Sequence, residues 1–213
     1  HLTTRRQRQM CIRDSNKERI KVLNNIEKEI VEIEKYCDER LNAWNDDIGL
    51  YTEFLDDNLN IESIKNITSS KGRIEFNLIY YRDFEPPMNR YNSMISSGDI
   101  KFIKSEKIKE TLTRLHNLNY SNLKTSVEYE KSLKQELINI LTENHSEILF
   151  AADSYKTSIE IYSSLLHKSI QSDQELKSNL LIQMKYFKSR VSLLKLYMYT
   201  LDELKSEVEN SLD

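Results

Sequence analysis

The chain has 213 residues, of which 31% are charged, and its formal net charge is −3. Only three Gly and two Pro are present, against the usual roughly 7% and 5%, which argues against a turn-rich fold and predicts mostly helical structure. The longest apolar run, Ile148 to Ala152, is far shorter than the ~18 residues that a membrane span needs. We therefore expect the chain as given to be soluble, and its length suits one domain or one elongated bundle.

The first fifteen residues differ in composition from everything that follows. Their charged residues are Arg5, Arg6, Arg8, Arg13 and Asp14, which give a net charge of +3. The remaining residues, 16–213, therefore carry a net charge of −6. The eleven residues that end at Ser15 resemble the translation of a transposase-type sequencing-library adapter. We therefore treat residues 1–15 as a non-native segment, exclude them from fold reasoning, and assign residues 16–213 to a single domain. The alternative is a basic arm that contacts nucleic acid or anionic lipid, but an acidic body without a basic stripe argues against nucleic-acid binding.

A long helix is predicted from Lys17 to Asp57, with Gly49 as a tolerated weak point. Its apolar residues recur at alternating steps of three and four, with a mean of roughly 3.5 residues, as in coiled coils. They are Ile20, Leu23, Ile26, Ile30, Ile33, Cys37, Leu41, Trp44, Ile48, Tyr51 and Leu55.

The segment after this helix begins like a calcium-binding loop. Its first, third and fifth positions carry side-chain oxygens, on Asp56, Asn58 and Asn60. The sixth position, however, is Ile61 instead of Gly, and the twelfth is Ile67 instead of Glu. We therefore interpret the segment as a polar helix end.

The next stretch has a mixed pattern. Ser69 to Gly72 is predicted as a turn or linker. Residues 73–84 alternate in part like a strand, but Ile79 and Tyr81 break the alternation, so this segment stays ambiguous between strand and helix. Pro86-Pro87 predicts an extended kink, because each Pro disfavours helical backbone in the residue before it.

Three helices are predicted between Met88 and Ile170. A short one spans Met88 to Ser96 and is closed by Ser97-Gly98-Asp99, with Gly98 at the left-handed C′ position. A long one starts at the N-cap candidate Ser105 and runs to about Glu143, with a possible kink at residues 117–122. A third one spans Ile148 to Ile170.

The last forty residues or so predict one uninterrupted helix, from Ser172 to Val208. Ser172 and Glu175 have the spacing of a capping box at its start. Its apolar stripe is Leu176, Leu180, Met184, Phe187, Val191, Leu194, Met198, Leu201, Leu204 and Val208. This helix matches the first one in length, so the two are expected to pack along each other. The fold class that we predict is all-α, an elongated antiparallel bundle built on these two coiled-coil-like helices.

No catalytic or cofactor motif stands out, since the chain lacks a nucleophile elbow, a P-loop and a dinucleotide fingerprint. The histidines His116, His145 and His167 lack metal-type companions and are interpreted as surface or half-buried residues. We accordingly predict no enzyme activity, no metal and no cofactor. A convergent cluster of His145 or His167 with buried carboxylates would revive an enzyme hypothesis.

Several other conspicuous residues are interpreted as structural. Cys37 and Trp44 lie on the apolar stripe of the first helix and are expected in the core. The acid pairs Asp46-Asp47 and Asp56-Asp57 are expected on solvated helix faces, because neighbouring side chains on a helix diverge. Cys11 and Cys37 are too few to form a disulfide framework, so the redox compartment stays open.

Tyr80, Tyr81 and Tyr91, near the double proline, form the most aromatic patch on the chain. They could form a binding surface, or they could plug the core under an irregular loop. Both interpretations stay open.

The stretch from Tyr91 to Ile103, with its Ser97-Gly98 turn, Asp99 and the following apolar pair, resembles a segment shared by a group of uncharacterised bacterial proteins. The run from Ser172 through Tyr186 and Tyr197 is similar to their last helix, and the likeness covers most of residues 17–213. The resemblance implies one N-terminal transmembrane helix upstream of Asn16, missing here. The positive-inside rule would then place residues 17–213 on the periplasmic side of the inner membrane.

Two functions follow as hypotheses. The first is a non-enzymatic, membrane-anchored protein of the cell envelope whose helical domain binds a protein partner or a second copy of itself. The alternative is an extracytoplasmic sensory or ligand-binding bundle, with the region from Tyr80 to Tyr91 lining a pocket.

Overall fold

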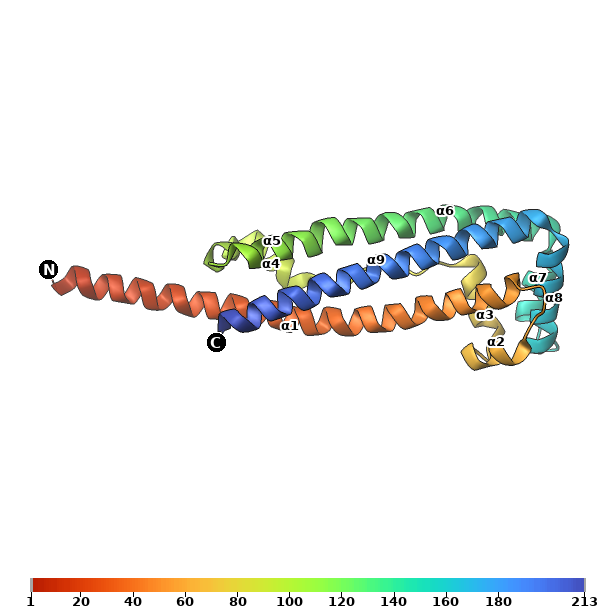
Figure 1. Ribbon diagram of the computed structural model, residues 1–213, viewed down its shortest axis with the longest axis horizontal. Helices are drawn as coiled ribbons and strands as arrows, with labels where there is room; N and C mark the ends of the chain where they lie inside the picture. The colour runs from red at the N-terminus through yellow and green to blue at the C-terminus, as the bar shows by residue number, and fades with distance from the viewer. Residues whose placement is uncertain (1, 213) are drawn as a thin grey trace. The chain divides into compact units, whose positions relative to one another are not determined.

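A computed structural model of the chain describes residues 2–212, with side chains from residue 13 onward. Within these residues all regular elements are helical and no β-strand is present, which confirms the all-α prediction. The α-helices (Figure 1) are α1 (Leu2–Leu55), α2 (Ile61–Ile67), α3 (Lys71–Ile79), α4 (Asn89–Ser97), α5 (Glu106–Thr113), α6 (Tyr120–Asn144), α7 (Ser146–Asp153), α8 (Ile159–Ser172) and α9 (Gln174–Leu212). Two further turns are η1 (Asp99–Phe102), a 3₁₀-helix, and η2 (Arg114–Asn119), a π-helix.

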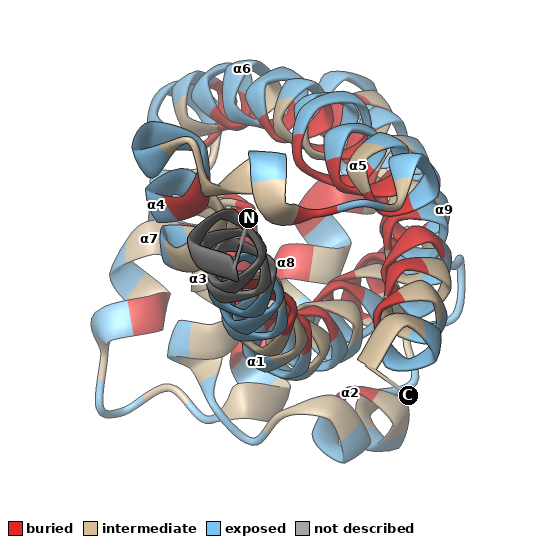
Figure 2. Ribbon diagram, turned by 90° about the vertical axis from the view of Figure 1, so that its left-hand side faces the viewer, coloured by how far each residue is buried: buried red, intermediate tan, exposed pale blue. Residues whose placement is uncertain are grey.

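The chain divides into two units. Unit 1 comprises His1–Glu39, Glu85–Ser121 and Leu194–Asp213, and unit 2 comprises Arg40–Phe84 and Asn122–Leu193. Helices α1 and α9 contribute to both. Buried residues lie along one side of these helices, and exposed residues lie along the other (Figure 2).

In unit 1 the core is formed by the apolar stripes of α1, α5 and α9. Fully or almost fully buried members include Leu23, Ile30, Ile33, Cys37, Ile108, Leu112, Leu194, Tyr197, Leu201, Leu204 and Val208. Burial of one such side chain stabilises the fold by about 1.5–3 kcal/mol. Outside this core Lys205 of α9 forms an ion pair with Glu34 of α1 at 2.8 Å.

In unit 2 α1 and α9 contribute to a second core, together with α2, α3, α6, α7 and α8. Its members include Leu50, Tyr51, Phe54, Ile74, Leu137, Leu141, Ile148, Tyr162, Leu166, Leu176, Leu180 and Phe187. The predicted core positions of Cys37 in unit 1 and Trp44 in unit 2 are confirmed, because neither residue has any exposed surface.

Two predicted helix boundaries are confirmed by their cap geometry. Helix α4 ends at Gly98, which has a φ of 73° and donates its N–H to the carbonyls of Ile95 and Met94. Helix α5 starts after Ser105, whose side chain accepts the N–H of Ile108. The segment from Asp56 to Asn60 is a link between helices, as expected, and Asn60 caps α2.

The segment from Ser69 to Phe84 differs from its sequence pattern. Ser70 is an N-cap that accepts the N–H of Arg73, and helix α3 then runs from Lys71 to Ile79. The apparent alternation of Ile74, Phe76 and Leu78 is therefore not a strand, and Gly72 lies within a helix instead of a turn.

The single helix predicted over Ile148 to Ile170 is wrong, because the structure has α7 and α8 with a break between them. Ser154 leaves helical geometry with ψ 118°, and Thr157 donates its N–H to the Ser154 carbonyl. Ser158 then caps α8 by accepting the N–H of Ile161. Serine side chains that bond to nearby backbone compete with helix continuation.

The capping box predicted at Ser172 is also wrong. Ser172 is the last residue of α8, and its hydroxyl donates to the Ser169 carbonyl. The cap of α9 is Asp173, whose carboxylate accepts the N–H groups of Glu175 and Leu176 at 2.8 and 3.2 Å.

Candidate functional site

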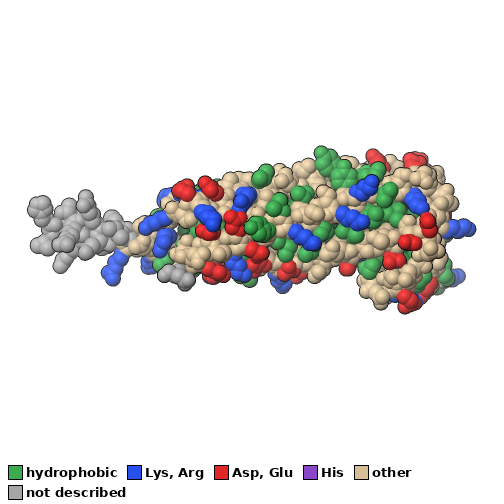
Figure 3. Space-filling model, in the orientation of Figure 1, with side chains coloured by type: hydrophobic (Ala, Val, Ile, Leu, Met, Phe, Trp, Pro, Cys, Tyr) green, Lys and Arg blue, Asp and Glu red, His purple; other side chains and the backbone are tan. Residues whose placement is uncertain are grey.

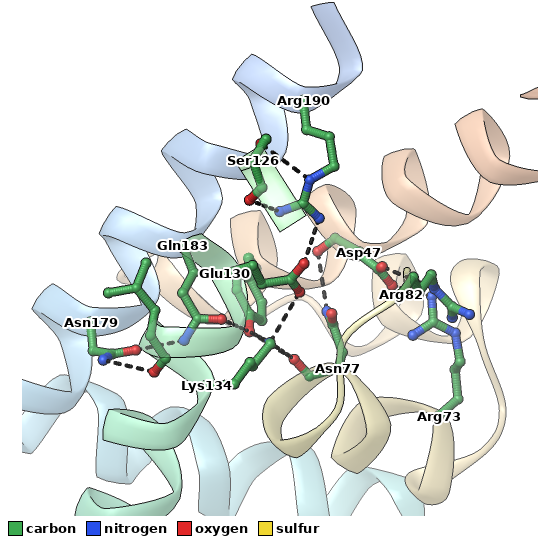
Figure 4. A network of polar contacts seen from close by, with 12 residues as sticks. Asp47, Arg73, Asn77, Arg82, Ser126, Glu130, Lys134, Asn179, Gln183 and Arg190 are labelled. Atoms are coloured by element: carbon green, nitrogen blue, oxygen red, sulfur yellow. Dashed lines mark hydrogen bonds and ion pairs between the residues drawn. The ribbon is translucent and has the colours of Figure 1, made fainter. Parts of the chain in front are cut away.

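The most elaborate polar arrangement is a buried network in unit 2, drawn in Figure 4. It joins side chains from α1, α3, α6 and α9. Its buried ionisable members are exposed by 3% or less: Asp47, Tyr51, Glu130, Lys134 and Arg190. Buried ionisable groups of this kind are common in active sites.

Arg190 on α9 forms the centre of one half of the network. Its guanidinium pairs with the Glu130 carboxylate, and its Nη2 donates to the Ser126 carbonyl at 3.0 Å. The guanidinium carbon lies 5.1 Å from the Trp44 ring centroid and 5.4 Å from that of Phe187. Desolvation raises the pKa of Glu130, and Arg190 opposes that rise.

Lys134 on α6 forms the centre of the other half. Its Nζ donates to the Tyr51 hydroxyl at 2.6 Å and to the Asn77 carbonyl, and lies 3.9 Å from the Glu130 carboxylate. The Tyr51 hydroxyl lies 3.0 Å from Oε1 of Gln183. Burial lowers the pKa of Lys134 to about 7 and raises that of Tyr51 well above its usual value.

Asp47 links α1 to the segment around α3. Its carboxylate pairs with Arg73 and, at 3.2 Å, with Arg82. The prediction that Asp46 and Asp47 both lie on a solvated face is therefore wrong for Asp47, which is 3% exposed, and holds for Asp46. The two arginines compensate for the cost of burying this carboxylate.

The network is suited to holding helices together. A neutral lysine beside a carboxyl group could in principle act as a base or nucleophile. Lys134 and Glu130, however, are each only 2% exposed, and their polar atoms contact other groups of the chain, so a substrate cannot reach them in this arrangement. In some proteins, buried polar contacts of this type fix the register between neighbouring helices.

Sequence reasoning missed Glu130, Lys134 and Arg190. A signal was present on α6, where the buried residues Val127, Glu130, Lys134 and Leu137 follow one another at steps of three, four and three. Glu130 and Lys134 thus occupy positions of the stripe where apolar residues are expected, and their spacing is that of the stripe.

In unit 1 the candidate residue Tyr91 lies at the start of α4, which is attached to α1. The Glu29 carboxylate of α1 accepts the N–H groups of Arg90 and Tyr91 at 2.6 and 3.1 Å. The Tyr91 ring stacks on His116, with 3.9 Å between the ring centroids. His116 was expected to be half-buried at most, but it is 4% exposed, and desolvation lowers its pKa to about 4.

A pocket of about 370 Å³ lies beside this attachment, between α1 and α4. Val22, Ile26 and Met94 form apolar walls, while Arg90 and Asp99 add opposite charges. The other predicted motif residues complete the turn after α4. Ser97 donates its hydroxyl to the Met94 carbonyl at 3.3 Å, and Ile103 is buried.

Tyr80 and Tyr81 belong to unit 2, whereas Tyr91 belongs to unit 1. Tyr80 is 58% exposed and stacks on Phe76. It also lines an apolar pocket of about 210 Å³ with Ile79, Ile138 and Leu149. Tyr81 is partly buried, and the Lys131 ammonium lies 5.5 Å from its ring centroid.

The remaining histidines make local contacts. His145 lies 2.8 Å from the Asp173 carboxylate, and His167 lies 2.8 Å from the Asp56 carbonyl. Among the described residues no group of His, Cys, Asp and Glu is arranged to hold a metal ion. None of the described helices has a stretch long and apolar enough to cross a membrane.

Comparison of the chain with protein-family models, with curated proteins and with solved structures finds no match. The family resemblance inferred from residues 91–103 and from the last helix therefore stays a prediction.

Proposed function

We propose that the chain is a non-enzymatic helical protein of the bacterial cell envelope that binds a protein partner or a second copy of itself. The observation that carries this proposal is that the buried ionisable groups of unit 2 are paired with one another and with other parts of the chain, while large apolar side chains are exposed. Glu130 pairs with both Lys134 and Arg190, and all three groups bond to other parts of the chain, which supports a structural role for them instead of a reactive one. Large apolar side chains, by contrast, remain exposed at Phe150 (76%), Tyr80 (58%) and Leu196 (51%).

Contacts within unit 2 support the antiparallel, coiled-coil-like pairing of α1 with α9 that the sequence predicts. Trp44 packs against Arg190, and seven residues further along α1 Tyr51 contacts Gln183, seven residues earlier in α9. A shift of seven in opposite directions is the register of antiparallel coiled coils. An elongated bundle is the corresponding proposal for the whole chain, and small-angle X-ray scattering tests it.

Attachment to the membrane is proposed from the family resemblance of residues 91–103. The test is to sequence the native gene upstream of the codon for Asn16. An apolar stretch of about 20 residues preceded by basic residues is the expected result. A native upstream sequence without such a stretch would remove the anchoring proposal.

Protein binding is tested by photo-crosslinking. A photoreactive amino acid is placed at Tyr80, Phe150 or Leu196 of the full chain, produced in its native host, and at the exposed polar residue Ser192 as a control. We expect a discrete crosslinked protein from at least one apolar position and none from Ser192. The absence of crosslinks from all three apolar positions would contradict the binding of a different protein.

The pocket between α1 and α4 favours a second candidate, a ligand-binding sensory bundle. Arg90 and Asp99 flank apolar walls there, which is a common composition for small-molecule sites. A thermal-shift screen with small metabolites separates the two functions, because a ligand that binds only the folded state raises the melting temperature. A stabilising compound whose effect is lost in Asp99→Asn would support the sensory function.

A further inference from the structure

We propose that a second copy of the chain docks on the groove between α6 and α9 of unit 2, in a symmetric dimer. This inference rests on the proposed function, for which it names one partner and one surface. The groove consists of a pocket of about 340 Å³, a pair of stacked tyrosines, and a second pocket of about 270 Å³.

Most of the residues that line this groove repeat at steps of three and four on both helices. On α6 the repeating positions are Ser126, Tyr129, Leu133, Glu136, Ile140 and Glu143, and Asn122, Thr125, Asn139 and Asn144 line the groove beside them. On α9 the repeating positions are Glu175, Asn179, Ile182, Tyr186, Ser189 and Leu193. Alternating steps of three and four return every seven residues, so another helix can lie along the groove and insert its side chains into the pockets.

The tyrosine pair forms a ridge within the groove. Tyr129 and Tyr186 stack with 5.7 Å between their ring centroids, and Tyr129 is 55% exposed. Neither hydroxyl makes a hydrogen bond to another part of the chain within residues 13–212. The ridge thus presents two unused donors and a large apolar surface. Figure 3 shows hydrophobic side chains over α6 and α9 on this face.

The larger pocket has the complementary chemistry. Glu136, Glu143 and Glu175 line it together with the apolar residues Leu133, Ile140 and Ile182. None of the three carboxylates is in an ion pair or a side-chain hydrogen bond within the described side chains. The pocket therefore presents both hydrogen-bond acceptors and apolar surface.

A two-fold axis between the tyrosine ridge and the glutamate-lined pocket lets both surfaces of each copy be covered by the other copy. The Tyr129–Tyr186 ridge of each copy then enters the glutamate-lined pocket of the other, and each contact is made twice, as in other isologous dimers. The phenol hydroxyls donate to carboxylates, and the exposed Lys185, one residue before Tyr186, adds opposite charge at the rim. Tyrosines that fill a partner's pocket are typical binding hot spots.

The experiment is analytical ultracentrifugation of the full chain over a wide concentration range. We expect a reversible dimer whose dissociation constant rises by about 30-fold or more in the double variant Tyr129→Ser, Tyr186→Ser. The matched control is Tyr155→Ser, Tyr199→Ser, which removes two tyrosines exposed by 90% and 68% outside the groove and should leave the dimer unchanged. Circular dichroism and urea unfolding verify that each variant is folded.

Cysteine crosslinking tests the arrangement itself. In a background with Cys11→Ser, a mixture of Tyr129→Cys and Asn139→Cys chains should form a disulfide-linked heterodimer more readily than either variant alone. A monomeric chain, or a dimer that persists in the groove variant, overturns the inference. The proposed binding of a different protein is tested separately by the photo-crosslinking. The absence of a dimer can therefore be distinguished from the absence of a different protein partner.

Discussion

Arg190 of α9 and Glu130 of α6 form an ion pair from which solvent is excluded, since their side chains are exposed by 0% and 3%. Removing one partner leaves the other charge buried, which typically costs about 3–5 kcal/mol. We expect Arg190→Met to lower the free energy of unfolding by this amount in urea denaturation. The double variant Arg190→Met, Glu130→Leu should recover part of the loss, because neither member of the ion pair is left without the other, but the Lys134 ammonium loses its Glu130 neighbour at 3.9 Å. A double variant as unstable as the sum of the single ones would show that the pair is not coupled.

The Lys134 ammonium makes stability depend on pH in a defined window. Burial lowers its pKa from 10.5 to about 7, so between these values the unfolded chain binds more protons than the folded chain. The contribution of Lys134 to the free energy of unfolding therefore rises with pH across this window and is constant below it. Measured from pH 7 to pH 10, the difference between the parent chain and Lys134→Met should shift in favour of the parent. A difference that does not change with pH would contradict this.

Asp46 and Asp47 are neighbouring carboxylates on α1, of which the first is exposed and the second is buried. Asp47→Ala should cost about 2–3 kcal/mol, below the value for a fully buried pair, because Arg73 and Arg82 are each 21% exposed. Asp46→Ala, on the exposed side of the same helix, should change the free energy of unfolding by less than about 0.5 kcal/mol. Equal effects in thermal or urea unfolding would refute the distinction.

Gly98 and Gly72 should respond to alanine in opposite directions. At a φ of 73° an alanine is strained, so Gly98→Ala should cost about 1 kcal/mol. Gly72 lies inside α3, where an added Cβ would meet only the Ser70 hydroxyl at 3.6 Å. Gly72→Ala should therefore stabilise the chain by about 0.5–1 kcal/mol. Both values come from urea unfolding, and a stabilising Gly98→Ala would be inconsistent with the left-handed cap.

Features that depend on a few neighbouring residues could be predicted from the sequence. The helical class, most of the stripe positions of α1 and α9, the Gly98 cap and the Ser105 cap follow from local pattern and turn chemistry, whereas the predicted stripe residue Ile20 is 46% exposed. The cap of α9 could not be read in this way, because Ser172 and Asp173 are both good cap residues, one position apart. Since α8 extends through Ser172, the helix that precedes the cap decides between them.

The buried network depends on pairing between distant segments. Glu130 and Lys134 look like solvated helix residues until Arg190 and Asn77 are placed opposite them. The same holds for Asp47, whose partners Arg73 and Arg82 lie in a stretch whose pattern is ambiguous between strand and helix. Charged residues within a buried stripe are informative only once their partners are known.

The π-turn η2 (Arg114–Asn119) affects any attempt to graft or align this part of the chain. A π-turn accommodates one residue more than an α-helix would, which rotates the following positions by about 100° around the axis. A heptad count carried from Ile108 into α6 is therefore out of phase from Tyr120 onward. A fusion to a designed coiled coil should be joined after Tyr120, or one residue should be deleted from η2 to restore a continuous frame.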